Sequence, residues 1–195
     1  MEAVDDRLYS FLKWTAIIIA VIVFAALLYN TFVIGRDPGD TAYLEGEQFF
    51  ADGLYDRAIE KYDQATRENP QHTFAMRGRA RALVKQGKYN QAVKEFDTII
   101  ALDPSLGVTY ANRGIAHDFA GHYEKAIADY EKALAMDPEL SEGPHWLTRF
   151  LRNQPDKPPG IADRAGYLKA QLELPPEKRL LRVPEIDEEQ RPYKQ

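Results

Sequence analysis

The chain has 195 residues and a formal net charge of −5. That length holds one membrane anchor and one small folded domain, and it excludes a second large domain. Residues 36–140 alone carry a net charge of −5. This acidity argues against a nucleic-acid binder, because such a protein needs a basic face for phosphates.

A long apolar segment follows the short N-terminal segment 1–13. Residues 14–35 contain no charged side chain, and about 20 apolar residues are enough to cross a hydrocarbon core of about 30 Å as a helix. Trp14, Tyr29 and Phe32 lie near the ends of the segment, where aromatic rings suit the two membrane interfaces. We therefore predict a transmembrane helix over residues 14–35.

A cleaved signal peptide is the alternative interpretation of this segment. The apolar region of a signal peptide is normally only about 7 to 15 residues long and precedes a cleavage site between small residues. Here the apolar segment is longer, and no A-x-A motif precedes Arg36. These two differences favour an uncleaved, single-pass anchor.

The flanking positive charges indicate how the anchor is oriented. Arg7 and Lys13 precede it, and only Arg36 lies within the next dozen residues. The positive-inside rule counts Lys and Arg and therefore favours a cytoplasmic N-terminus. In a bacterium this topology corresponds to the inner (cytoplasmic) membrane, with the rest of the chain in the periplasm.

The next hundred residues repeat with a fixed period. Pro70, Pro104 and Pro138 stand 34 residues apart and close three similar segments, GLYDRAIEKYDQATRENP, GKYNQAVKEFDTIIALDP and GHYEKAIADYEKALAMDP. A period of this size indicates stacked helical repeats. Each segment opens with a glycine, which suits a tight turn. A small residue and an aromatic residue then recur on one helix face. These columns contain Ala58, Ala92 and Ala126, and then Tyr62, Phe96 and Tyr130.

This pattern resembles the tetratricopeptide repeat, a helix–turn–helix unit of 34 residues. The resemblance covers residues 39–140 as three units, 39–72, 73–106 and 107–140. It implies an all-α fold, in which one N-terminal transmembrane helix precedes a three-repeat helical solenoid. Such an array ends in a capping helix with a polar outer face. We assign the cap to residues 141–153, whose apolar side chains include Trp146, Leu147, Phe150 and Leu151.

The remaining residues, 154–195, are rich in proline. Eight of the twelve prolines lie after residue 140, which is typical of an extended linker and tail. One short amphipathic helix is predicted by the spacing of Ile161, Ala165, Leu168 and Leu172. The apolar residues of the extended tail that follows favour docking on another protein. The alternative is that the apolar stripe and the tail fold back on the repeats.

No motif for chemistry is present. The sequence contains no cysteine, no G-x-S-x-G, no Walker-type glycine loop and no H-E-x-x-H. We therefore predict that the protein is not an enzyme and has no cofactor or metal site. His117 and His122 are five residues apart across a helix end, and we expect them to lie on different faces as polar residues rather than as metal ligands.

The resemblance implies where a partner would bind, because the first helices of such units line a concave groove for a peptide. On that basis the predicted partner-binding residues are Tyr43, Glu47, Phe50, Arg77, Arg81, Lys85, Asn112, Ile115, Asp118 and Phe119.

The second unit places three of these residues, Arg77, Arg81 and Lys85, at i, i+4 and i+8, which forms a basic stripe on one helix face. This stripe could pair with an acidic peptide; the alternative is a solvated face. Some family members clamp a chaperone's C-terminal carboxylate with Lys and Asn. Tyr43 and Glu47 occupy the first unit's positions for that clamp, so we do not expect that activity.

These inferences predict a membrane-anchored protein–protein interaction scaffold. We expect an accessory or assembly subunit of a multiprotein membrane complex, such as a respiratory, photosynthetic or envelope assembly. The expected partners are other proteins, above all integral membrane subunits, and the bilayer through residues 14–35; nucleic acid and small-molecule substrates are not expected. The alternative is a docking receptor that captures transient clients or acidic peptides in the groove.

Overall fold

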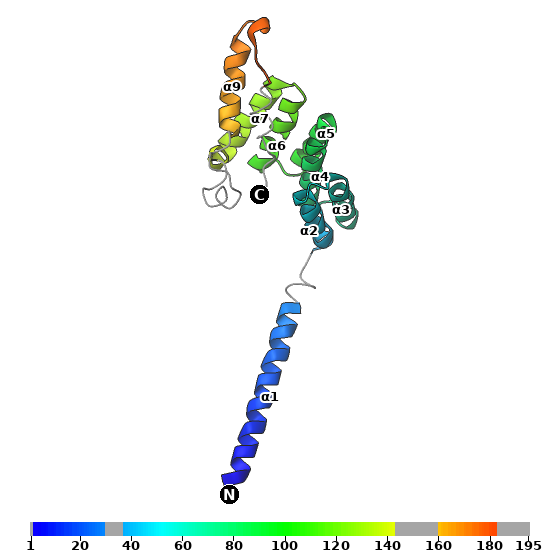
Figure 1. The fold of residues 1–195 in the computed structure, drawn as a ribbon, viewed down its shortest axis with the longest axis vertical. Helices are drawn as coiled ribbons and strands as arrows, with labels where there is room; N and C mark the ends of the chain where they lie inside the picture. The colour runs from blue at the N-terminus through cyan, green and yellow to red at the C-terminus, as the bar shows by residue number, and fades with distance from the viewer. Residues whose placement is uncertain (1, 30–36, 143–159, 183–195) are drawn as a thin grey trace.

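The computed structural model describes residues 2–29, 37–142 and 160–182, and within these ranges every regular element is a helix. The first, α1 (Glu2–Tyr29), stands apart from the others (Figure 1). Its part Leu8–Tyr29 is long and apolar enough to cross a membrane, and the large apolar side chains along it are exposed. The apolar helix therefore begins before residue 14, while residues 30–35 of the expected span lie outside the described residues.

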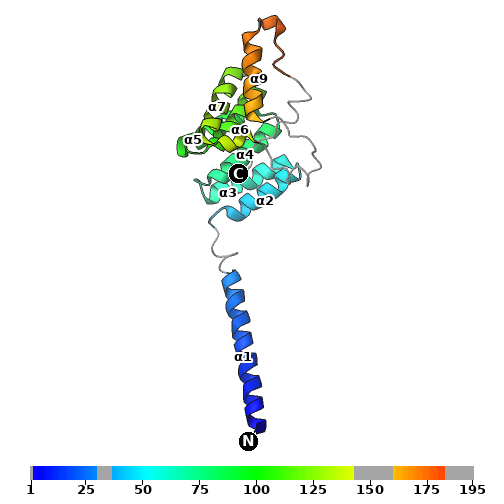
Figure 2. The same cartoon turned by 90° about the vertical axis from the view of Figure 1, so that its left-hand side faces the viewer.

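Six further helices form three consecutive hairpins. The pairs are α2 (Asp40–Ala51) with α3 (Tyr55–Glu68), α4 (Thr73–Lys85) with α5 (Tyr89–Leu102), and α6 (Gly107–Phe119) with α7 (Tyr123–Met136). Each second helix also packs against the first helix of the next hairpin, and α4 contacts both α2 and α6. The hairpins therefore stack side by side into one solenoid (Figures 1 and 2). The predicted all-α repeat fold is confirmed.

The same glycine turn closes every hairpin. Gly53, Gly87 and Gly121 have φ angles of 76°, 74° and 81°, in the left-handed region that strains residues with a Cβ. The amide of the residue after each glycine donates to the carbonyl five positions back, at 2.9, 2.9 and 2.8 Å. This bond closes the end of the first helix and reverses the chain, so the glycine turns expected from the sequence are present in all three units.

The recurring aromatic column forms the core. Tyr62, Phe96 and Tyr130 are fully buried. A Cβ built on Gly46 or Gly114 would lie 2.7 Å from the ring of Tyr62 or Tyr130, far inside van der Waals contact. Gly46 and Gly114, together with Gly78 of α4 beside Tyr62, therefore provide the space into which the tyrosine rings pack.

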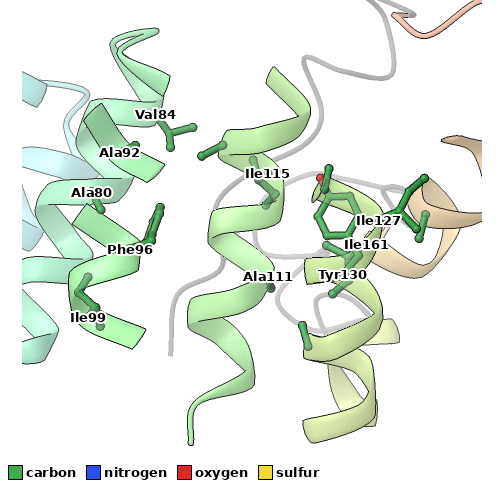
Figure 3. Close-up of a cluster of buried hydrophobic side chains, with 14 of the residues drawn as sticks. Ala80, Val84, Ala92, Phe96, Ile99, Ala111, Ile115, Ile127, Tyr130 and Ile161 are labelled. Carbon is green, nitrogen blue, oxygen red and sulfur yellow. The ribbon is translucent and has the colours of Figure 1, made fainter. Parts of the chain in front are cut away.

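A further helix, α9 (Ile161–Glu173), packs against α7 and covers the C-terminal end of the array. Its side chains Ile161, Ala165 and Leu168 are buried in the same cluster as Tyr130, and Figure 3 shows Ile161 beside Tyr130 and Ile127. The predicted apolar stripe therefore faces the repeats. A short 3-10 helix, η2 (Pro138–Ser141), precedes this region. We had expected residues 141–153 to cap the array, and of these only 141 and 142 belong to the described residues.

The chain returns toward the repeats after α9. It turns at η3 (Pro176–Lys178), and the Leu181 carbonyl then accepts a hydrogen bond from Arg164 Nη2 at 3.0 Å. Arg182 donates to the carbonyl of Phe119, the last residue of α6. For residues 160–182 the structure therefore has the fold-back alternative, and the preference for docking on another protein is wrong there. The remaining tail, 183–195, lies outside the described residues.

The cap can be tested by truncating its most buried side chain. Leu168 is 0% exposed, so Leu168→Ala should lower the free energy of unfolding by about 2–5 kcal/mol through lost burial and the cavity left behind. The matched control is Leu174→Ala, at the end of the same helix, where the side chain is 38% exposed; its effect should stay within about 0.5 kcal/mol. Urea unfolding followed by circular dichroism measures both, and equal effects would contradict the capping role of α9.

Candidate functional site

The ten predicted binding residues lie on the three first helices, α2, α4 and α6, and α4 contacts both of the others. We call this set the first-helix face. It contains Tyr43, Glu47, Phe50, Arg77, Arg81, Lys85, Asn112, Ile115, Asp118 and Phe119.

The arginines of the expected basic stripe are buried rather than solvated. Arg81 is 6% exposed and lies 3.3 Å from Glu47 of the preceding repeat. The same Glu47 oxygen accepts a 2.6 Å hydrogen bond from the Tyr62 hydroxyl, and the Arg81 guanidinium lies 4.5 Å from the centre of the Phe50 ring. A buried charge persists when it is paired and hydrogen-bonded. Arg81 and Glu47 therefore join the first two repeats and are not free to bind a partner.

Burial has opposite effects on two titrating side chains of this region. It raises the pKa of the Tyr62 hydroxyl well above its usual range, and the hydrogen bond to Glu47 adds to this effect, so Tyr62 remains a donor. Burial also lowers the pKa of the Arg77 guanidinium, against the opposing effect of Asp103. Arg77 is 5% exposed and lies 4.8 Å from the Phe74 ring. A positive charge in such a setting gains from any further carboxylate nearby.

The third repeat contains a second buried acid with the same kinds of partner. Asp118 accepts a hydrogen bond from the Tyr130 hydroxyl at 3.2 Å. It also accepts two bonds from Arg164 of α9, at 2.7 and 2.9 Å. Tyrosine, acid and arginine therefore recur in the order seen at Tyr62, Glu47 and Arg81. In this arrangement α9 takes the place of the first helix of a fourth unit.

Two other predicted binding residues serve packing. Ile115 is fully buried in the core, as Figure 3 shows. Phe119 stacks on Tyr89 of the preceding repeat, with ring centres 5.4 Å apart and 14° between the planes. A first helix packs against neighbours on both sides, so part of the column assigned to the groove points into these interfaces.

An accessible aromatic cluster lies at the start of α4. The Tyr43 ring is 5.3 Å from His72 and 6.1 Å from Phe74, and Phe74 remains 49% exposed. His72 Nδ1 accepts from the amide of Ala75 at 3.2 Å, so the proton is on Nε2, which lies 3.1 Å from Asp40. These hydrogen bonds hold the His72 ring at the N-terminus of α4. The exposed ring of Phe74 provides an apolar surface beside Arg77.

A ladder of arginines was missed by the sequence analysis. Arg79 of α4 bonds to Asp63 and Glu95. One period later, Arg113 of α6 contacts Asp97 at 2.7 Å and Asp129 at 2.6 Å. Each arginine thus lies between the second helices of two successive repeats. The signal that could have revealed the ladder is the 34-residue spacing of its arginine and acidic columns.

The prediction that His117 and His122 lie on different faces is wrong. Their Nδ1 atoms are 3.4 Å apart, because the turn at Gly121 brings the His122 amide to within 2.8 Å of the His117 carbonyl. Burial lowers the pKa of His117 against the opposing effect of Asp129, and the neighbouring side chains of Arg113 and His122 lower it further. The described residues contain no group of three or more His, Cys, Asp or Glu side chains that could hold a metal ion.

Comparisons with known proteins agree with this architecture. Two models described as tetratricopeptide repeat match residues 49–106 and 108–140. The second such domain of Spaghetti (RPAP3), solved with the HSP90 peptide SRMEEVD, is 32% identical, with a TM-score of 0.50 over 52% of this chain and 94% of that one. The chain belongs to the tetratricopeptide repeat family.

Two further solved structures are similar to this tetratricopeptide repeat protein. The first repeat domain of Spaghetti (RPAP3), bound to the same peptide, is 26% identical with a TM-score of 0.51, covering 60% of this chain and 90% of that one. The first repeat domain of human RPAP3 shares the fold at 24% identity and a TM-score of 0.53, covering 70% and 98%. A comparison with curated proteins found no match.

The buried pair between Asp118 and Arg164 should be essential for stability. Arg164→Met leaves the Asp118 carboxylate buried without its cation, which should cost about 3–5 kcal/mol of unfolding free energy. The control is Lys169→Met on the same helix, whose partner Glu131 is 52% exposed; its loss should be at most about 1 kcal/mol. Denaturant titration of both variants measures the difference, and a small effect at Arg164 would show that α9 is not fixed by this pair.

The pKa of His117 should be measurable by NMR. Because the folded-state pKa lies below the unfolded value of about 6.5, the unfolded chain binds more protons as pH falls. The stability linked to His117 is therefore full above pH 6.5 and is lost as pH falls from there toward the folded pKa. Titration of the imidazole Cε1 proton should give a midpoint below 6.5, which His122→Gln should raise. A midpoint at or above 6.5 would contradict the burial effect.

Proposed function

We propose that this protein is a membrane-anchored interaction scaffold, with α1 in the bilayer and the repeats binding segments of other proteins. The observation that supports this proposal is the combination of an exposed apolar helix with a tetratricopeptide repeat array in one chain. Soluble proteins rarely expose an apolar surface as large as that of about twenty consecutive residues, and exposed patches of that kind mark membrane or protein contacts. The family is one of protein-interaction modules, which supports a binding role.

The anchor sets the location that we propose. Arg7 and Lys13 precede the expected span 14–35, which supports a cytoplasmic N-terminus and repeats on the periplasmic side of a bacterial inner membrane. Only residues 36–39 lie between the expected span 14–35 and α2, which begins at Asp40. A tether this short raises the effective concentration of the repeats toward partners in the same membrane. Stable integral membrane subunits are therefore the partners that we propose, with an accessory or assembly role in their complex.

The accessible part of the first-helix face indicates the chemistry of the bound segment. Phe74, which lies beside the first-helix face, and Tyr43 supply aromatic surface, and Lys85 in the last turn of α4 adds positive charge. A segment with apolar and acidic side chains would match both. The acidic peptides held by the two Spaghetti domains also support the alternative role, a docking receptor for transient acidic clients.

Purification of the tagged full-length protein from its native membrane in mild detergent tests the proposal. We expect a fixed set of integral membrane proteins that stays bound at high salt, because apolar contacts dominate stable interfaces. Phe74→Asp should release the set. Leu102→Asp is the matched control, since Leu102 is similarly exposed, at 50%, but lies at the end of a second helix.

Each other result has a defined meaning. Acidic clients that dissociate as salt is raised would favour the docking receptor, because exposed charge is screened by salt. Equal loss in both variants, or no partner at all, would contradict binding at the first-helix face.

A further inference from the structure

The turn between α6 and α7 holds two imidazole rings that the proposed function does not use. His117 lies in the last turn of α6, and His122 immediately precedes α7. We propose that His117 and His122 form a binding site for a zinc ion, with one ring nitrogen of each as a ligand. From the sequence alone we expected no metal site here, because the two rings were placed on different faces. This inference is independent of the proposed function, since neither histidine belongs to the first-helix face.

The main chain of the turn brings the two side chains together. The amide of His122 donates to the carbonyl of His117 at 2.8 Å, and the amide of Gly121 donates to the carbonyl of Asp118 at 2.9 Å. Together with the left-handed backbone of Gly121, these bonds form a Schellman ending of the helix, in which the side chains at the two outer positions commonly touch. The two rings are therefore held side by side by main-chain hydrogen bonds.

The other two units have the same turn with different side chains at these positions. One period earlier the pair is Leu83 with Lys88, and two periods earlier it is Phe49 with Leu54. The same main-chain bond joins each pair at 2.9 Å. Apolar side chains are the usual contact at such a helix end. The turn itself therefore does not require histidine, and the third unit differs from the others by having two metal-ligand side chains there.

The distance between the two ring nitrogens suits a tetrahedral zinc ion. The Nδ1 atoms of His117 and His122 are 3.4 Å apart, which is longer than the roughly 2.7–3.2 Å of a usual N–H hydrogen bond. Zinc binds imidazole nitrogen at about 2.0–2.1 Å with tetrahedral geometry, so two such ligands lie about 3.3–3.4 Å apart. A square-planar ion with the same bond length needs about 2.9 Å between neighbouring ligands. The spacing therefore favours zinc over Cu²⁺.

The burial of the two rings leaves the site accessible from one side. His117 is 7% exposed, whereas His122 is an exposed residue, so an ion can enter beside His122 and lie against the buried ring. The part of the chain that the structure describes offers no group of three or more His, Cys, Asp or Glu ligands. Two positions of the zinc tetrahedron are therefore left for water in the isolated protein.

The surrounding charges partly cancel at this site. The negative charge of Asp129 acts on His117 and favours a cation there, while the positive charges of Arg113 and Lys125 oppose it. Arg113 is itself paired with Asp97 at 2.7 Å and with Asp129 at 2.6 Å, which reduces its opposition. Imidazole nitrogen suits zinc, whereas Mg²⁺ and Ca²⁺ take oxygen ligands. The site should therefore select zinc over these hard cations by ligand type rather than by charge.

Titration of the full-length protein in detergent, without a polyhistidine tag, with zinc sulfate tests the proposal. We expect the imidazole Cε1 proton signals of His117 and His122 to shift together in NMR spectra and to level off at about one zinc ion per chain. The His72 signal is the internal control and should stay in place, because its Nδ1 accepts from the Ala75 amide and its Nε2 lies 3.1 Å from Asp40. Magnesium sulfate should shift neither signal of the pair.

Substitutions show whether both rings bind the ion. Loss of even an outer-shell partner of a metal ligand costs about 10–100-fold in affinity, so His117→Gln and His122→Gln should each weaken zinc binding at least about tenfold. Lys125→Gln is the matched control, because it keeps both rings and removes an opposing charge; it should bind zinc at least as tightly as the wild type. Zinc binding that leaves both histidine signals in place, or that is equally tight in all three variants, would overturn the proposal.

Urea unfolding covers the case in which the buried His117 is needed for folding. Zinc that binds the folded chain raises its unfolding midpoint. Because His122 is exposed, His122→Gln should keep the midpoint measured without zinc and lose only the increase that zinc causes. An increase that persists in this variant would place the ion elsewhere and overturn the proposal.

Discussion

The array depends on buried carboxylates that join one first helix to the next. Glu47 and Asp118 each lie inside the protein, where an unpaired charge would be prohibitively costly. Each accepts a hydrogen bond from a tyrosine of a second helix and pairs with an arginine of the next helix along the array, α4 for Glu47 and α9 for Asp118. Because hydrogen bonds have strict geometry, these contacts define the register between units in a way that apolar contacts alone do not.

These buried ion pairs reduce the number of first-helix residues that are available to bind a partner. Arg81 and Asp118 look like binding residues in a linear sequence, yet both hold the array together. We propose that a partner instead contacts the accessible aromatic rings at the start of α4. Under this proposal, binding and stability depend on neighbouring residues of one helix face.

The fold could be predicted largely from the sequence, because its main determinants are local. The glycines of the turns and the aromatic column repeat every 34 residues, and each acts within its own hairpin. Contacts between distant segments could not be predicted. The partner of Asp118 is Arg164, 46 positions away, and periodicity carries no information about it. The relative position of His117 and His122 was predicted wrongly for a different reason. Helical periodicity does not apply beyond Gly121, because its left-handed backbone conformation reverses the chain.

The middle unit lacks the tyrosine hydroxyl, because Phe96 occupies that column. One period beyond Arg81 stands Ile115, so the buried acid and arginine have no counterpart between α4 and α6 among the described residues. That boundary is held by apolar packing and by the partly exposed ion pair of Arg113 with Asp97. Apolar attraction has no preferred direction. The second and third repeats nevertheless share one continuous core cluster, so the register at this boundary depends on how closely the shapes of the apolar side chains fit one another.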